Sequence, residues 1–160
     1  MQKLPKAPDD NFSAKYDLYG NMLFKISMVQ LGNKEDVEEA MQEAFYRLLY
    51  NSPEFRDDEH EKAWLIRTVI NLCRDMRRNA WYRRVIKTEE IHKYYDNPPD
   101  RDVMMEILRL PAKYKTVIHL HYFEDYSVKE ISEILKIKES AIKMRLMRGR
   151  QLLKIELEGE

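Results

Sequence analysis

Residues 127–154, SVKEISEILKIKESAIKMRLMRGRQLLK, contain two helical patterns separated by a short turn. The first four residues, SVKE, match a capping box, which predicts that a short helix begins there. After the turn at 136–138, apolar residues recur at helical spacing and predict a longer, basic helix over 139–157. Such an arrangement is typical of the helix-turn-helix, whose second helix lies in the major groove of DNA. The segment therefore favours DNA binding over the alternative, an ordinary helical hairpin with a solvated basic face.

The second of these helices has a core side and an opposite side that carries basic and apolar residues. At about 100° per residue, Ile142, Leu146 and Gly149 share the core side. On the outer side, arginine is suited to pairing with guanine, lysine to contacting phosphates, and apolar side chains to touching thymine methyl groups. The residues predicted to contact duplex DNA are Lys138, Ser140, Ala141, Lys143, Met144, Arg145, Met147 and Arg148.

The first half of the chain predicts three helices, over residues 13–31, 34–50 and 61–84. Apolar residues recur every three to four positions in each of them. Gly32 supplies a stop after the first helix, and Pro53 follows the end of the second. Three amphipathic helices joined by short connections are expected to pack as a bundle.

The prolines at 98 and 99 interrupt this helical pattern. Consecutive prolines disfavour helix and favour an extended segment, so we place a linker there. A further helix is expected over 112–123, before the helix-turn-helix. The predicted fold class is all-α, with two small helical domains at 13–84 and 102–157 joined by a linker at 85–101.

The formal net charge of zero hides three strongly charged blocks. Residues 33–61 hold 3 basic and 10 acidic residues, a local charge of −7, and residues 62–87 hold 8 basic and 1 acidic, a local charge of +7. Residues 128–154 hold 8 basic and 3 acidic, a local charge of +5. Separate blocks of both signs indicate more than one charged partner. The acidic helix would repel DNA, so we expect it to bind a basic protein surface, unless it is only a solvated face.

Basic residues also follow one side of the predicted third helix. Together with Trp81 and Tyr82 near its end, they suit a nucleic acid whose bases are partly unstacked. The alternative is an amphipathic helix whose charged side faces water, and Trp64 is interpreted as a core residue rather than a stacking platform. The candidate contacts on this helix are Arg67, Asn71, Arg74, Arg77 and Arg78.

Other kinds of chemistry have little support in the sequence. The one cysteine, Cys73, excludes an internal disulfide framework and a cysteine-rich zinc site, and it fits a reducing compartment. His119 and His121 stand two apart, so on a helix they point to different sides and cannot hold one metal together. We find no nucleophile motif, glycine-rich phosphate loop, secretory signal or membrane-length apolar run. We therefore expect a cytoplasmic protein without catalytic activity, cofactor, bound metal, small-molecule substrate or membrane insertion.

Several motifs follow one another in a fixed order along the chain. The first half contains EDVEEAMQEAF at 35–45, AWLIR at 63–67 and NLCRDMRR at 71–78. The second half contains LPAKY at 110–114, YFEDYS at 122–127 and AIKMRLMRGR at 141–150. This ordered set, which spans about 13–157, resembles conserved regions 2 and 4 of the extracytoplasmic-function (ECF) sigma factors of bacterial RNA polymerase, in the sigma-70 family.

The resemblance implies a role for each charged block. In that family the acidic helix docks on the clamp helices of the largest polymerase subunit. The loop at 52–58 and the polar face of the third helix would melt and read the minus-ten promoter element, and the helix-turn-helix would read the minus-thirty-five element as duplex. The implied partners are core RNA polymerase, promoter DNA and an anti-sigma factor that silences the free protein. The implied polymerase-docking residues are Asp36, Glu38, Glu39, Gln42 and Glu43.

The helix-turn-helix departs from the family pattern at four positions. Lys136 stands where the family usually has Gly, and Lys138 where it usually has Ser, so the reading helix lacks its usual N-cap unless Ser140 caps a later start. Met144 and Ala141 replace the Ser and Thr that are frequent in the family, so no promoter preference transfers. The rival interpretation is a stand-alone helix-turn-helix transcriptional regulator whose first half serves dimerisation or sensing.

Overall fold

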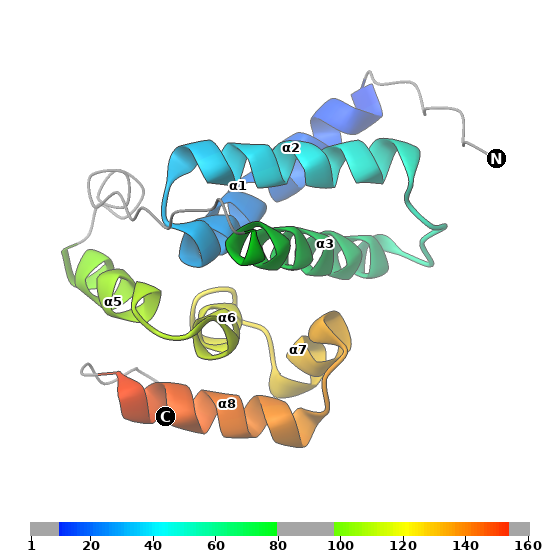
Figure 1. The fold of residues 1–160 in the computed structure, drawn as a ribbon. Helices are drawn as coiled ribbons and strands as arrows, with labels where there is room; N and C mark the ends of the chain where they lie inside the picture. Colours follow the sequence, from blue (N-terminus) through cyan, green and yellow to red (C-terminus); the bar gives the residue numbers. More distant parts are fainter. Residues whose placement is uncertain (1–9, 80–97, 154–160) are drawn as a thin grey trace.

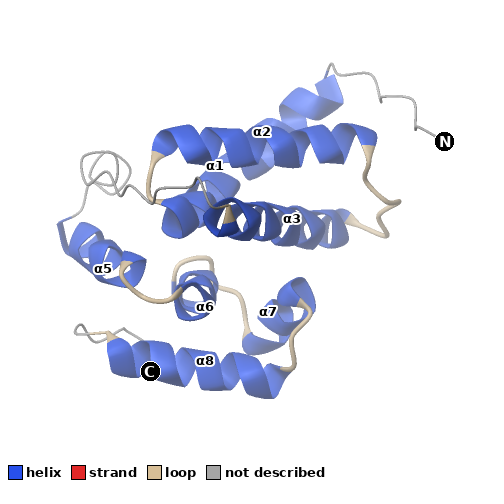
Figure 2. Cartoon of the chain, viewed as in Figure 1, coloured by secondary structure: helices blue, strands red, loops and turns tan. Residues whose placement is uncertain are grey.

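The computed structural model describes residues 10–79 and 98–153, and every regular element within them is a helix (Figure 2). In the first half α1 (Asp10–Leu31), α2 (Lys34–Tyr50) and α3 (Asp58–Arg78) pack as a three-helix bundle (Figure 1). The second half contains α5 (Pro98–Leu108), α6 (Ala112–Tyr122), α7 (Val128–Leu135) and α8 (Glu139–Leu152). In Figure 1, α6 lies between the bundle and α8. The prediction of an all-α fold with a helix-turn-helix in the second half is confirmed.

A tight turn at Gly32 and Asn33 reverses the chain between α1 and α2. Gly32 has a φ of 78°, in the left-handed region that costs other residues about 1–2 kcal/mol. The Asn33 side chain then accepts a hydrogen bond of 3.0 Å from the Asp36 backbone N–H and caps α2. The reversal lets α1, α2 and α3 bury one shared apolar core. Its members include Leu23, Ile26, Val37, Phe45, Leu65, Val69 and Cys73.

The third helix differs from its prediction at both ends. It begins at Asp58 because the Asp57 side chain accepts the His60 backbone N–H at 2.8 Å and caps it there. Asn79, with φ −64° and ψ 129°, leaves the helical conformation, so the predicted continuation to residue 84 is wrong. Residues 80–84, which include Trp81 and Tyr82, lie outside the described residues. The first helix begins at Asp10, earlier than the predicted residue 13.

The prolines at 98 and 99 begin a helix instead of extending the chain. Helix α5 starts at Pro98, inside the predicted linker. Proline is tolerated in the first turn because the N–H that it lacks has no intrahelical acceptor there. The expectation of an extended segment at these two residues is therefore wrong, and residues 85–97 of the predicted linker lie outside the described residues.

The helix-turn-helix forms as its sequence predicts, with one unusual residue in the turn. The Ser127 Oγ accepts the Glu130 N–H at 3.1 Å, and Glu130 Oε1 accepts the Ser127 N–H at 3.0 Å, which completes the capping box of α7. Lys136 ends α7 in the left-handed conformation, with φ 58°. Lys138 occupies the N-cap of α8 without a side-chain bond, and Ser140 lies inside the helix. The expected lack of a side-chain cap is therefore confirmed.

The reading helix α8 packs closely on α6. A Cβ atom at Gly149 would lie 2.9 Å from Cγ1 of Ile118, so only glycine allows the two helices to approach this closely. Helix α8 ends at Leu152, because Leu153 adopts an extended conformation with ψ 139°. The predicted end at residue 157 is therefore wrong, and residues 154–157 lie outside the described residues.

Replacing Lys136 by glycine is expected to stabilise the protein. A left-handed conformation costs a residue with a side chain about 1–2 kcal/mol, whereas glycine adopts it freely, so the free energy of unfolding should rise by about 1 kcal/mol. Urea denaturation of the wild type and of Lys136→Gly measures this difference. Lys138→Gly is the matched control, because Lys138 has a φ of −59° and its replacement should give no gain. Equal or lower stability of Lys136→Gly would contradict the explanation.

His119 is a buried histidine that remains neutral. Its side chain is 2% exposed, its ring stacks on Phe123 with a centroid separation of 5.8 Å, and its Nε2 has no hydrogen-bond partner among the described residues. Glu124 Oε1 lies 3.7 Å from that nitrogen, which is too far for a hydrogen bond. Burial, and secondarily the charge of Lys25, lowers the pKa of His119 to about 3.

The protein is therefore expected to lose stability as the pH falls below the ordinary histidine pKa of about 6.5. Between about pH 6.5 and about pH 3, His119 is protonated in the unfolded chain but neutral in the folded protein. The free energy of unfolding therefore falls by up to about 1.4 kcal/mol per pH unit. Burial raises the pKa of Glu124, which acts in the opposite direction but is shared by wild type and variant. Stability curves of the wild type and of His119→Gln from pH 7 to 4 should diverge. Parallel curves would show that His119 titrates normally.

Candidate nucleic-acid and protein interfaces

The outward side of α8 is exposed along its whole length. Met144 is 50% exposed and Met147 is 44% exposed, so two large apolar side chains three residues apart face solvent on this side. Ala141 and Arg145 are half-buried at the edge of this side, while Ile142, Leu146 and Gly149 are buried beneath it. The structure therefore places the eight predicted duplex-contacting residues on α8 and the turn before it. The remaining exposed members are Lys138, Ser140, Lys143 and Arg148.

A hollow of about 480 Å³ is lined by α8 and the first turn of α6. From α8 it is lined by Ala141, Met144, Arg145 and Arg148, and from α6 by Lys113 and Tyr114. Lys113 is exposed, and its Nζ lies 5.0 Å from the centre of the Tyr114 ring. Sequence reasoning missed Lys113 as a neighbour of the reading helix, because its own helix shows no basic pattern. The motif LPAKY at 110–114, which contains Lys113, was the sequence feature that could have indicated this position.

The polar side of α3 has two exposed and three half-buried candidate residues. Arg74 and Arg78 are exposed, and Arg67 and Asn71 are half-buried on the same side. Arg77 turns away from them and donates a hydrogen bond of 2.7 Å from Nη1 to Oε1 of Gln30 on α1. The helix therefore brings together four of the five predicted residues and directs the fifth toward α1.

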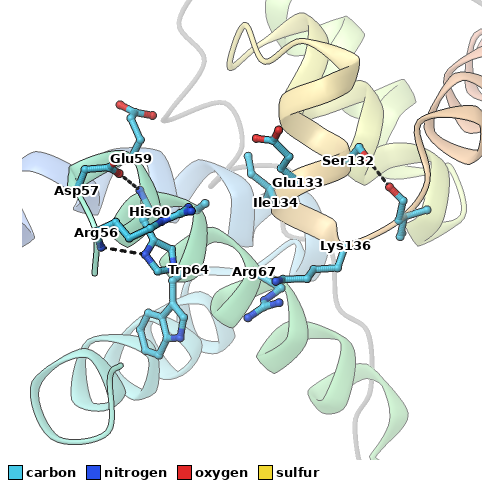
Figure 3. A pocket seen from close by; sticks show the side chains of 12 residues that line it. Arg56, Asp57, Glu59, His60, Trp64, Arg67, Ser132, Glu133, Ile134 and Lys136 are labelled. Carbon is cyan, nitrogen blue, oxygen red and sulfur yellow. Dashed lines mark hydrogen bonds between the residues drawn. The ribbon is translucent and has the colours of Figure 1, made fainter. Parts of the chain in front are cut away.

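A cleft of about 800 Å³ lies between the start of α3 and α7 (Figure 3). Arg56, His60, Trp64 and Arg67 line it from the first half, and side chains of α7 and the following turn face them. His60 Nδ1 accepts the Arg56 backbone N–H at 3.1 Å, which fixes the loop before α3. Trp64 is half-buried and packs edge-on against Phe55 at 5.6 Å. Trp64 lines the cleft and also packs against the hydrophobic core, which agrees with its interpretation as a core residue.

The acidic side of α2 is open to solvent. The side chains of Glu38 and Glu43 are 61% and 48% exposed, and each forms a surface ion pair, with Lys34 and Arg47 respectively. Glu39 and Gln42 are exposed, whereas Asp36 is half-buried and accepts a hydrogen bond of 2.7 Å from the Asn33 side chain. Four of the five predicted docking residues therefore share an exposed face.

An exposed aromatic residue stands in the middle of this acidic face. Tyr46 is 53% exposed, packs against the Tyr50 ring at a centroid separation of 4.6 Å and an interplanar angle of 35°, and lines hollows on both sides of α2. Helical spacing places it one turn after Gln42 and Glu43. Sequence reasoning did not include Tyr46 among the docking residues, because it carries no charge.

Two further tests of the structure concern metals and membranes. Within residues 10–79 and 98–153, no three histidine, cysteine or carboxylate side chains gather into a group that could hold a metal ion. None of the helices described for this chain combines the length and the apolar character that crossing a bilayer requires. Cys73 is buried, and burial raises the pKa of its thiol to about 12.

Comparisons with known proteins match both halves of the chain. The family model of sigma-70 region 2 matches residues 16–83, and that of sigma-70 region 4 matches residues 100–153. The ECF RNA polymerase sigma factor SigW of Bacillus subtilis is 32% identical, over 98% of this chain and 94% of the relative. The RNA polymerase sigma factor SigV of the same species is 28% identical, over 86% and 85%.

A solved structure shares the fold at low sequence identity. It is the sigma factor RpoE in complex with the anti-sigma factor NepR, from Bartonella quintana, with a TM-score of 0.66 and 17% identity, over 90% of this chain and 94% of that one. The helical architecture, the two regional matches and the near full-length relative agree. The chain belongs to the ECF sigma factors of the sigma-70 family, which direct transcription initiation by RNA polymerase.

Proposed function

We propose that this chain is a promoter-specificity subunit whose three exposed faces serve three different contacts. The acidic face of α2 binds core RNA polymerase, the basic side of α3 reads the minus-ten element, and the outward side of α8 reads the minus-thirty-five element. The observation that best supports this assignment is that one chain exposes an acidic face on α2 and, on a different helix, a basic and apolar reading face. A stand-alone regulator would need the second face but not the first.

The proposal includes a division of the chain and a way of silencing it. Residues 13–84 form the domain that docks on polymerase and reads the minus-ten element, residues 85–101 form the linker, and residues 102–157 form the domain that reads the minus-thirty-five element. The protein acts in the cytoplasm, has no catalytic activity of its own, and is held by an anti-sigma factor when it is not needed. The crystallised complex of RpoE with NepR supports the last point by similarity of fold.

Binding to core polymerase separates this function from its rival. We expect the purified chain to co-elute with core RNA polymerase, and the complex to protect two promoter segments about 25 base pairs apart, which is about 85 Å of duplex. A regulator would instead bind a palindromic duplex by itself, as a dimer with half-sites about one helical turn apart. Failure to co-elute, together with dimeric binding to such a duplex, would establish the rival.

Alanine substitutions at two residues of α8 are expected to weaken promoter binding in different ways. Arg148→Ala should weaken binding of the holoenzyme to its minus-thirty-five element by about 10- to 100-fold and relax the preference at one base pair, because an arginine pairs with guanine bidentately. Lys143→Ala should weaken binding to all sequences alike. It should also reduce the slope of log affinity against log salt concentration by about one, because one phosphate contact is lost. Affinity measurements on a set of single-base promoter variants test this difference. Identical profiles for the two variants would contradict the assignment of Arg148 to a base.

A further inference from the structure

The outward side of α8 carries the two exposed methionines of residues 10–79 and 98–153. Met144 and Met147 stand three residues apart, so their thioether side chains lie on the same side of the helix. The other methionines of these ranges are buried or half-buried: Met22, Met28, Met41, Met76, Met104 and Met105. A small molecule in solution therefore meets the methionines of α8 first when no DNA covers the helix.

An exposed thioether can undergo a two-electron oxidation by hydrogen peroxide, which gives methionine sulfoxide. The sulfur donates an electron pair to one peroxide oxygen, and an S–O bond forms as the O–O bond breaks. The other oxygen takes the proton of the first and leaves as water, so sulfur loses two electrons and the peroxide gains them. The reaction needs access to the sulfur atom, and it should therefore be fastest at the two exposed methionines.

Each of these two methionines has a cation one helical turn away. Arg148 follows Met144 by four residues, and Lys143 precedes Met147 by four residues, so the side chains of each pair are neighbours on the helix surface. Arg148 also lines the same hollow as Met144. Helix α8 as a whole has four basic residues and one acidic residue, a local charge of +3. These cations stabilise the negative charge that develops on the departing peroxide oxygen.

The one cysteine of the chain does not compete for the oxidant. Cys73 is buried on α3, and burial raises the pKa of its thiol to about 12. The thiolate is the form that reacts with oxidants, and at neutral pH essentially no thiolate is present at such a residue. Among the sulfur atoms of the described residues, the two on α8 are therefore the ones that an oxidant reaches first.

We propose that Met144 and Met147 form a reversible oxidation site through which hydrogen peroxide blocks reading of the minus-thirty-five element. The inference rests on the proposed function, because it takes the outward side of α8 as the surface that contacts duplex DNA. A sulfoxide is polar, so it cannot make the apolar contact with a thymine methyl group that a thioether makes. The new acceptor oxygen on Met144 also competes with DNA for the donors of Arg145 and Arg148, which line the same hollow.

The test oxidises the full chain before it meets the polymerase. The purified chain is treated with hydrogen peroxide, catalase removes the excess, and the chain is combined with untreated core RNA polymerase. Cleavage after glutamate releases residues 140–156, which contain Met144 and Met147 and no other methionine, so mass spectrometry of this fragment measures the added oxygen. Affinity is measured on a promoter fragment that the untreated holoenzyme recovers from fragmented genomic DNA. Treatment of the oxidised chain with methionine sulfoxide reductases tests reversal.

Three double variants separate oxidation at α8 from damage elsewhere. Met144→Leu with Met147→Leu keeps apolar side chains of similar volume that peroxide does not oxidise. Met144→Gln with Met147→Gln places polar acceptors at the same positions without any oxidant. The matched control, Met22→Leu with Met105→Leu, removes two half-buried methionines on α1 and α5. The affinity of each variant after treatment is divided by its own affinity before treatment, so a changed starting affinity does not affect the comparison.

We expect the fragment 140–156 of the wild type to gain oxygen before any other methionine-containing fragment. The holoenzyme made with the oxidised chain should bind its promoter about 10- to 100-fold more weakly, because two apolar contacts are replaced by polar groups without partners. The reductases should restore the affinity. The Met22/Met105 control should lose affinity as the wild type does, and the leucine variant should keep its own affinity after treatment. The glutamine variant should already bind more weakly than the untreated wild type.

Three results would overturn the proposal: oxidation that begins at other methionines, an oxidised wild type that binds as tightly as before, or a leucine variant that loses as much affinity as the wild type. A different result concerns the proposed function alone. If the fragment 140–156 is oxidised first but the untreated chain never binds a promoter with core polymerase, the proposed function fails while the oxidation site stands.

Discussion

Reversing Glu38 and Glu43 to lysine is expected to abolish binding of the chain to core RNA polymerase. Both carboxylates are exposed on the acidic face of α2, and a basic partner surface would meet two positive charges instead of two negative ones. Like charges facing each other across an interface cost several kcal/mol, so the affinity should fall by about 100-fold or more. Measuring the affinity of labelled core polymerase for the double variant gives the result.

The expected loss of affinity for core polymerase should not come from unfolding of α2. The two residues form exposed ion pairs with Lys34 and Arg47, and such helix pairs contribute only about 0.3–0.5 kcal/mol each. The control variant carries Asp17→Lys and Asp102→Lys, which change the net charge equally at exposed sites outside α2. Unchanged affinity of the double variant, or an equal loss in the control, would show that α2 is not the docking face.

Removing Arg74 and Arg78 is expected to impair promoter opening far more than holoenzyme assembly. Both side chains are exposed on the polar side of α3, one turn apart, where they would contact phosphates of the melted strand. Arg74→Ala with Arg78→Ala should lower open-complex formation by about 10- to 100-fold. The slope of its logarithm against log salt concentration should fall by about two, because two phosphate contacts are lost. Permanganate footprinting measures opening, and co-elution measures assembly.

The control for this variant removes an arginine that lies elsewhere. Arg109→Ala deletes an exposed side chain that pairs with Glu106 at 2.9 Å and belongs to neither α3 nor α8. It should open promoters as the wild type does. If the α3 variant lost assembly and opening to the same extent, the basic side of α3 would belong to the polymerase interface instead.

The local parts of this fold could be predicted because their causes lie within a few residues of sequence. Helix α2 spans Lys34–Tyr50 as its apolar spacing predicts, and α7 begins where the Ser127–Glu130 capping box places it. The core side of α8 follows from helical periodicity alone. The left-handed Lys136 falls at the position where the family pattern has glycine, which explains that pattern physically.

The contacts between the two halves could not be predicted in the same way. Gln30, Arg77 and Thr116 belong to three different helices, and no periodic pattern connects them. The four arginines and one asparagine of α3 were assigned together from their chemistry, but only the packing of α1 shows that Arg77 points elsewhere. The place of Trp64 beside the cleft between α3 and α7 could not be predicted either, because the spacing along α3 indicates only its packing against the core.

Transcription by purified core RNA polymerase, on fragmented genomic DNA and with or without this chain, tests the central claim most directly. We expect new transcripts only when the chain is present, starting downstream of one shared pair of elements about 25 base pairs apart, or about 85 Å. The Glu38→Lys/Glu43→Lys variant should give none of these starts. No new starts with the wild type, despite active core polymerase, would contradict the assignment of this chain as a promoter-specificity subunit.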